Sequence, residues 1–184
     1  MAQKQTASAK EKSRIKADLS SLPESEPVPV GELNLDPKNP RLTGEEYSVA
    51  DQEKILKRLW NEFNVSEITD SIFASQQFWN HEPLIAAIEG NRRLAAVQLL
   101  LSRRLQKKIG ASGVPQISAK LANSLARLPV IKKPRSAVWD FIGFKHVNGP
   151  QEWDSIAKAE YVARVHEDYD VPLPEIAQAT GHCN

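Results

Sequence analysis

The stretch Ile88–Leu101, IEGNRRLAAVQLLL, decides the expected fold because two different patterns meet inside it. The run that leads into it, EPLIAAI from Glu82 to Ile88, is short and apolar, which favours a buried strand. From Asn91 onward, apolar residues recur at helical spacing, which predicts one helix from Asn91 to about Lys108. A glycine and two adjacent arginines therefore lie at a strand-to-helix junction.

This junction has the composition of an anion-binding site. Gly90 lets the backbone turn sharply and lets a ligand approach closely. The first turn of a helix has free backbone N–H groups and the positive end of the helix dipole. Arg92 and Arg93 oppose that dipole, but arginine grips phosphate with two parallel hydrogen bonds, so a bound anion would offset the cost. Glu89 is a candidate arginine partner, metal ligand or base.

The alternative is that both arginines are surface residues paired with acidic residues elsewhere in the fold. The stretch contains neither the G-x-x-x-x-G-K-[ST] pattern of a P-loop nor the G-x-G-x-x-G pattern of a dinucleotide-binding turn.

The charges are unevenly distributed along the chain, although the net charge is only +1. Residues 90–139 contain 11 Lys and Arg and no Asp or Glu, so this segment should attract polyanions such as DNA. Pairing with acids elsewhere in the fold is again the alternative. The candidate DNA contacts are Arg103, Arg104, Lys107, Lys108, Lys132, Lys133 and Arg135.

Length and composition favour a cytoplasmic protein with one ordinary domain and a tail. The chain has 184 residues, of which 41% are hydrophobic and 26% charged, and no apolar run is long enough to span a membrane. Its single cysteine, Cys183, excludes an internal disulfide framework. We expect a disordered basic and Pro-rich tail at 1–27, the main domain at 28–150, and a helical segment at 151–184.

The order of elements predicts a mixed α/β (α+β) fold. We expect strands at 28–35, 82–88 and 128–131. Besides the helix from Asn91, we expect helices from Ser48 or Asp51 to Asn61, at 65–74 with Ser66 as its cap, at 116–127, and at 154–168 capped by Asp154. The tryptophans at 60, 79 and 153 are expected to fill the core or an interface.

Several segments, in order, resemble the sequence boxes of ParB-type partition proteins. EGNRRLAAV resembles the family's G-E-R-R-x-R-A box, and LDPKNPR resembles its first box. ITDSI followed by EPLI resembles the helix and strand before the arginine box. IGFKHVNGPQEW resembles a third box of the form G-x-x-H-x-x-G-x-x-x-W, and IAQATG resembles the first half of a helix-turn-helix. The similarity covers Val28 to Gly181.

The resemblance implies the ParB/sulfiredoxin fold, a small mixed sheet flanked by helices. Members of this superfamily include ATP- or CTP-binding partition clamps, nucleases, a serine kinase and sulfiredoxin. By position, it implies a nucleotide-phosphate site at Arg41, Gly90, Asn91, Arg92, Arg93, Lys145 and Asn148. It also makes Glu89 and His146 the candidate catalytic residues, with Glu89 as the candidate metal ligand.

The chain departs from the family at several points. Asn91 stands where sulfiredoxin has its cysteine, which argues against sulfinic-acid reduction. The third box reads FKHVNG instead of E-N-x-x-R, which weakens the case for a CTP-specific clamp. The segment from Pro83 to Glu89 is short for the usual hairpin. The sequence given ends before the recognition helix of the expected helix-turn-helix, and the alternative is a simple C-terminal helix that Gly181 stops.

The expected function is therefore nucleotide binding in a DNA-associated protein. It would be an ATP- or CTP-dependent NTPase, with Mg2+ as a further cofactor, or a metal-dependent DNase, acting in plasmid partition, maintenance or transfer. The expected partners are DNA, the nucleotide, a protein of a plasmid or transfer system, and a second copy of the chain, without a membrane. The alternatives are a non-enzymatic DNA- or partner-binding adaptor and a kinase of the same fold that phosphorylates a small molecule or a protein.

Overall fold

A small mixed sheet lies at the centre of the fold. The structure is a computed structural model that describes residues 24–85, 89–147 and 153–180. The sheet contains β1 (Glu26–Pro29), β2 (Leu84–Ile85) and β3 (Arg127–Ile131) in the order β1-β3-β2. β1 runs antiparallel to β3, and β2 runs parallel to it. The expected mixed class is thus confirmed at this coarse level.

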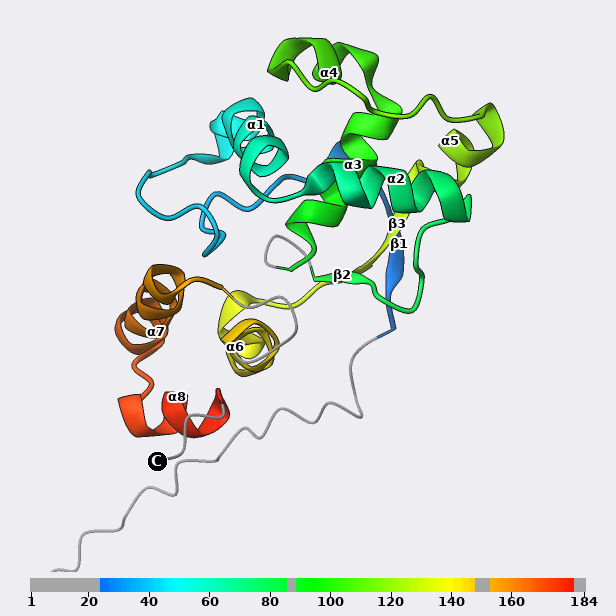
Figure 1. Ribbon diagram of the computed structural model, residues 1–184. Coiled ribbons are helices and arrows are strands. Elements are labelled where there is room, and N and C mark those ends of the chain that lie inside the picture. The colour runs from blue at the N-terminus through cyan, green and yellow to red at the C-terminus, as the bar shows by residue number, and fades with distance from the viewer. Residues whose placement is uncertain (1–23, 86–88, 148–152, 181–184) are drawn as a thin grey trace, which may run out of the picture.

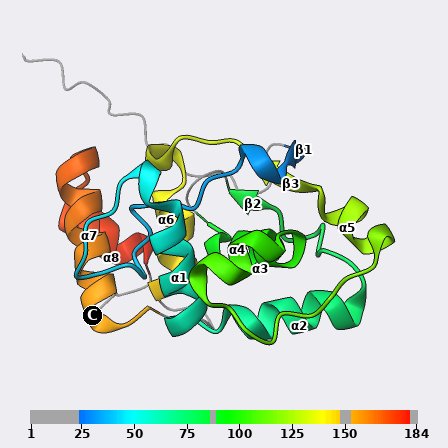
Figure 2. The same ribbon diagram turned by 90° about the horizontal axis from the view of Figure 1, so that it is seen from above.

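Five helices pack with the sheet around the first hydrophobic core. They are α1 (Gln52–Glu62), α2 (Val65–Ser75), α3 (Asn91–Leu101), α4 (Arg103–Ile109) and α5 (Ala119–Leu125). Figure 2 shows α3 between the sheet and α2. This central position fits the sequence of α3, because a helix that is apolar on most sides must be buried on most sides. Its buried residues include Leu94, Ala95, Ala96, Val97, Leu99 and Leu100.

The last three helices form a second core beside the first (Figure 1). They are α6 (Trp139–Val147), α7 (Ser155–Tyr169) and α8 (Leu173–Ala179). Their core contains Val138, Ile142, Trp153, Ala157, Tyr161, Val165 and Ile176, and Ile85 of β2 joins it. α6 therefore packs with α7 and α8, so the second packing unit begins near Val138.

The expectation of one continuous helix from Asn91 to Lys108 is wrong, because the chain breaks at Ser102. This residue is extended, with φ −133° and ψ 98°, and its hydroxyl accepts the Leu105 N–H at 3.2 Å. Its side chain thus caps a new helix. Gly110, in the left-handed region, ends α4 as expected.

Other element boundaries also differ from the sequence expectations. The strand expected at 28–35 instead spans Glu26–Pro29, so it begins inside the segment expected as a disordered tail at 1–27, and a 3-10 turn, η2 (Val30–Glu32), follows it. Asn64, rather than Ser66, lies at the N-cap of α2. Of the strand expected at 82–88, β2 covers only Leu84–Ile85, and residues 86–88 lie outside the described residues.

The expected helix at 116–127 is shorter, because α5 begins at Ala119 and ends at Leu125. The expected cap of α7 is confirmed, since the Asp154 carboxylate accepts the Ala157 N–H at 2.8 Å. Within the described parts of the chain, no helix has the length and apolar character of a membrane span.

Candidate functional site

A cavity of about 250 Å³ opens at the N-terminal end of α3, where residues from the two cores meet. Four parts of the chain contribute to it: the loop before α1, α2 and the turn after it, the segment entering α3, and the α6–α7 region. Its lining residues are Asn39, Arg41, Ile68, Trp79, Glu82, Glu89, Gly90, Asn91, Arg92, Arg93, His146 and Trp153.

The chain reverses direction immediately before this site. Ile85 and Glu89 exchange two backbone hydrogen bonds of 3.2 and 3.1 Å, and Gly90 then starts α3 with φ +91°. A Cβ at Gly90 would overlap the Cδ2 atom of Leu84 and lie 3.3 Å from the guanidinium of Arg93. Both the backbone conformation and the available space therefore require glycine here.

Arg93 is buried and joined to acidic residues. Its Nη2 donates to Glu89 Oε2 at 2.6 Å, and its Nη1 donates to the backbone carbonyl of Glu82. The Glu82 carboxylate lies 3.6 Å from the same Nη1. Arg93 is therefore not the surface residue that the alternative expected, but it is paired with acids, and Glu89 is the arginine partner that the sequence allowed it to be. Through these contacts with Glu82 and Glu89, Arg93 stabilises the segment that enters α3.

Arg41 and Arg92 supply the other two positive charges of the pocket. Nη2 of Arg92 donates to the Asn64 carbonyl at 3.2 Å, and burial lowers the pKa of this guanidinium, opposed by Glu67. Burial also lowers the pKa of Arg41, and the charge of Arg92 lowers it further, whereas Glu89 and Asp154 act in the opposite direction. Two guanidinium groups from distant segments thus line one pocket, and the charge of Arg92 acts on Arg41.

Asn91 has a role that its sequence position does not reveal. It is buried, and its Oδ1 accepts the backbone N–H of Asp36 at 2.7 Å. This bond ties the start of α3 to the loop that carries Arg41. Within that loop, Asn39 Oδ1 accepts the Arg41 N–H at 3.1 Å. Asn91 therefore positions part of the pocket wall.

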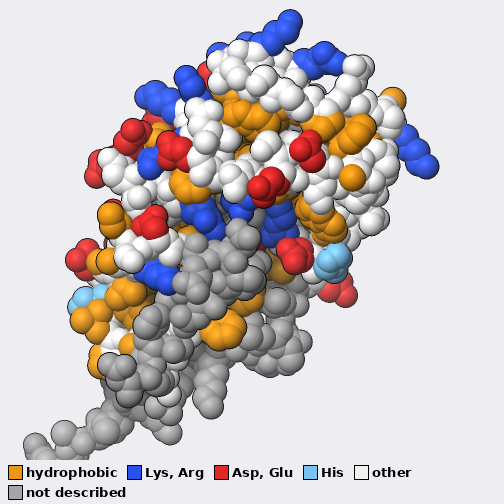
Figure 3. Space-filling model, viewed as in Figure 1, with side chains coloured by type: hydrophobic (Ala, Val, Ile, Leu, Met, Phe, Trp, Pro, Cys, Tyr) orange, Lys and Arg blue, Asp and Glu red, His pale blue; other side chains and the backbone are white. Residues whose placement is uncertain are grey.

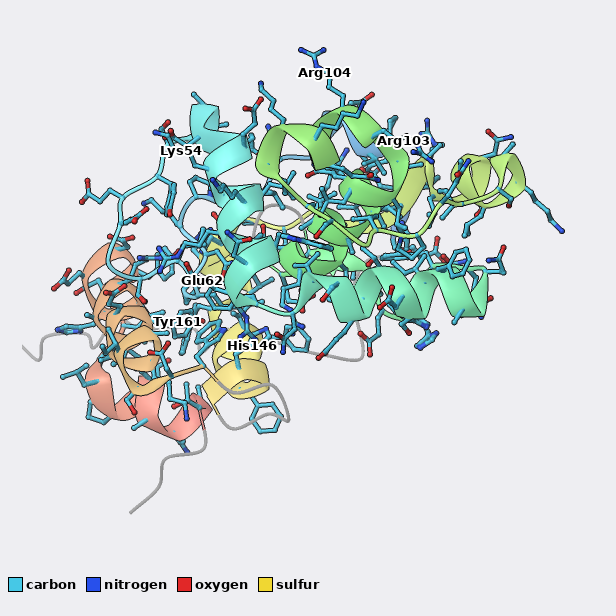
Figure 4. All side chains as sticks on the ribbon, turned by 45° about the horizontal axis from the view of Figure 1, so that its top comes forward. Lys54, Glu62, Arg103, Arg104, His146 and Tyr161 are labelled. Carbon is cyan, nitrogen blue, oxygen red and sulfur yellow. The ribbon has the colours of Figure 1, made fainter. Side chains whose placement is uncertain are left out.

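His146 reaches the pocket from α6, and Figure 4 shows it pointing towards the α1 and α2 side of the molecule. Its Nε2 lies 3.8 Å from Glu89 Oε1, and its ring stacks on Trp153 with 4.8 Å between centroids and 13° between planes. Glu89 thus lies between Arg93 and His146. Of the other third-box residues, Lys145 is described only by its backbone in α6, and Asn148 lies outside the described residues.

The structure divides the expected DNA contacts into two sets. Arg103, Arg104 and Lys107 are exposed on α4, and Figure 4 shows Arg104 pointing away from the fold. Figure 3 shows Lys and Arg side chains spread along the α4 edge rather than gathered in one continuous patch. α4 follows the C-terminal end of α3, whereas the pocket is at its N-terminal end.

The second set is paired or partly buried. Lys108 pairs with Glu53, Lys132 pairs with Glu26, and Arg135 Nη2 lies 2.5 Å from the buried carboxylate of Asp36. Lys133 is half-buried. Acids from outside the segment therefore neutralise part of its charge.

Sequence reasoning missed the apolar members of the pocket: Ile68, Trp79 and Trp153. Trp153 lies within the third box, whereas Trp79 lies outside every matched box, so neither composition nor spacing distinguished it from a core residue. Among the described residues, no group of three or more His, Cys, Asp or Glu is arranged to hold a metal ion.

Comparisons with protein-family models, curated proteins and solved structures found no match. The resemblance to ParB-type proteins rests on the sequence boxes alone. Of the residues that those boxes nominate, Arg41, Glu89, Gly90, Asn91, Arg92, Arg93 and His146 line one pocket.

Proposed function

We propose that the chain binds the phosphate groups of a nucleoside triphosphate, ATP or CTP, in the pocket at the start of α3, and that it does so as a ParB-like, DNA-associated protein. The observation that carries the proposal is the convergence of Arg41 and Arg92, which come from separate segments. An anion bound by both guanidinium groups would offset the effect of the Arg92 charge on Arg41, and the N–H groups of the first turn of α3 would add to its binding.

In this proposal the charged residues have different tasks. Arg41 and Arg92 contact phosphate, whereas Arg93 holds Glu89 and the Glu82 carbonyl in place. Glu89 and His146 are the groups for proton transfer if the bound nucleotide is hydrolysed, because an imidazole beside a carboxylate is a common acid–base arrangement. Mg2+ would be held chiefly by the phosphate oxygens, as is usual for this ion.

Calorimetric titration with ATP, CTP and inorganic tripolyphosphate, each with magnesium, tests the proposal. We expect Arg41→Ala and Arg92→Ala each to weaken binding about tenfold or more, because a charge-assisted hydrogen bond contributes roughly 1.5–3 kcal/mol. Arg104→Ala is the matched control, because it removes the same charge from the exposed surface of α4. Unchanged binding in both pocket variants, or an equal loss in the control, would contradict the assignment. Phosphate release in the same samples reports hydrolysis.

The exposed cations of α4 favour a second candidate, an adaptor that binds DNA without chemistry. Binding to duplex DNA should then fall steeply with salt. If the pocket itself clamps DNA phosphate, Arg92→Ala weakens DNA binding and no nucleoside triphosphate binds. If DNA contacts α4 and nucleotide fills the pocket, Arg104→Ala weakens only DNA binding and Arg92→Ala weakens only nucleotide binding.

A further inference from the structure

One aromatic ring in the pocket remains available to a ligand. Trp153 is only 5% exposed, because His146 stacks on it and Tyr161 meets it edge-on at 5.0 Å. Trp79 is partly exposed and lines the same cavity. It packs against the first core beside the buried Phe78, with 6.3 Å between the two ring centroids.

The backbone that carries Trp79 is tied to the proposed phosphate site. The Glu82 N–H donates to the Trp79 carbonyl at 3.0 Å, which closes a tight turn. Arg93 donates to the backbone carbonyl of Glu82 and faces its carboxylate at 3.6 Å. Since Arg92 precedes Arg93 on α3, one helical turn positions both the phosphate-binding guanidinium and the turn that carries the ring.

The apolar wall continues onto α2. Ile68 lines the pocket one turn from the start of that helix. The Asn64 carbonyl, just before the helix, accepts a hydrogen bond from the Arg92 guanidinium. The apolar residues Ile68 and Trp79 therefore lie in the same pocket as the charged residues. This combination suits a ligand that joins an anionic group to a flat ring.

We propose that Trp79, in the pocket that Ile68 also lines, is the platform on which the base of the bound nucleotide stacks. This proposal rests on the proposed function. Stacking of a base on an aromatic side chain contributes roughly 1–3 kcal/mol and tolerates any base, because every base has a π face. The cavity of about 250 Å³ is smaller than the usual site for a drug-sized ligand, which places part of a nucleotide at the open rim.

The test compares ligands with and without a ring. We expect Trp79→Leu, which keeps an apolar side chain but removes the π face, to weaken ATP and CTP binding about tenfold and to leave inorganic tripolyphosphate binding unchanged. Trp79→Phe should retain most of the affinity for both nucleotides. Trp60→Phe is a control for loss of a tryptophan, because Trp60 packs on the first core and does not line the pocket.

Two results would overturn the platform. One is an equal loss of tripolyphosphate and ATP binding in Trp79→Leu, and the other is unchanged ATP binding in that variant. Thermal unfolding of each variant confirms that the comparison is made between folded proteins. Failure of the proposed phosphate site can be distinguished from failure of the platform. If the phosphate site is wrong, Arg92→Ala leaves tripolyphosphate binding unchanged, whatever Trp79→Leu does to ATP binding.

Discussion

Gly90 satisfies two separate requirements at the residue scale. Its backbone is left-handed, and a side chain there would overlap the buried Leu84 and approach Arg93. Gly44 has a similar φ of +81° but open space around its Cα, so it meets only the first requirement. Substitutions at these two glycines can therefore distinguish the cost of backbone strain from the cost of steric overlap within one protein.

We expect Gly44→Ala to lower the free energy of unfolding by about 1–2 kcal/mol, which is the cost of a left-handed backbone for an L-residue. Gly90→Ala should cost more, because it must also displace a core leucine, and it should weaken tripolyphosphate binding by shifting the first turn of α3. Urea denaturation and titration of both variants check this. Equal losses of stability would show that steric overlap at Gly90 adds nothing.

Arg92 and Arg93 show which properties of a single residue can be predicted from the sequence around it. Their composition and place at the start of a helix predicted a cluster of charge around Gly90. The difference between them depends on a 100° rotation per helical residue and on the course of other segments. Arg93 meets Glu89 and Glu82, and Arg92 meets Asn64, which is 28 residues away. The pair of Arg93 and Glu89 is local, four residues apart, and Glu89 was a candidate arginine partner, whereas no local pattern contains the contact of Arg92 with Asn64.

Element boundaries depend on competition between apolar periodicity and capping side chains. Apolar residues continue at helical spacing past Leu101, and this pattern predicted one helix. The hydroxyl of Ser102 instead satisfies a backbone N–H and starts α4 in a new direction. Where the pattern and the cap agree, as at Asp154 before α7, the sequence expectation was confirmed.

Close packing of α6 against its neighbours leaves little space for a side chain at Gly143. A Cβ at Gly143 would lie 2.8 Å from Thr180 Cγ2 and 3.1 Å from a ring carbon of Tyr161. Alanine usually stabilises a helix interior relative to glycine by roughly 0.5–1 kcal/mol. In α6 the contacts with α7 and with the end of α8 should reverse that sign.

We expect Gly143→Ala to destabilise the protein by about 1–3 kcal/mol through overpacking. Adding Thr180→Ser removes the methyl group and keeps the hydroxyl that donates to the Ile176 carbonyl, so it should restore part of the loss. Urea midpoints of the single and double variants, with Thr180→Ser alone as the control, measure the coupling. A stabilised Gly143→Ala variant would show that the helices move apart at no cost.

At the scale of the whole molecule, the loop from Asp36 to Arg41 joins the two cores. Asn91 of α3 accepts the Asp36 N–H, and Arg135, just before α6, binds the Asp36 carboxylate. Arg164 of α7 donates to the Lys38 carbonyl at 2.7 Å. The loop that delivers Arg41 to the pocket is therefore held from both sides. These partners are 55 to 126 residues apart, so the amphipathic pattern predicted the helices but not their connection.

The pair of the buried Asp36 and the partly exposed Arg135 gives this connection a pH dependence. Asp36 is 3% exposed, and burial raises its pKa above the usual value, while Arg135 lowers it. Because the pKa of Asp36 is higher in the folded protein than in the unfolded chain, its protonation stabilises the fold fully at pH values below its pKa in the unfolded chain. That contribution is lost as pH rises through the folded pKa.

Arg135→Leu removes the opposing charge, so the pKa of Asp36 should rise further and the loss of stability with rising pH should grow. We expect the variant to be closest to the wild type near pH ~4 and to fall about 3 kcal/mol behind it near neutrality, because breaking a buried pair leaves an uncompensated charge. Adding Asp36→Asn removes that charge and should restore much of the neutral-pH stability. Urea denaturation at both pH values compares the three proteins. A deficit of the single variant that is the same at both would mean that Arg135 acts through packing alone, and the two cores would then be joined by shape rather than by charge.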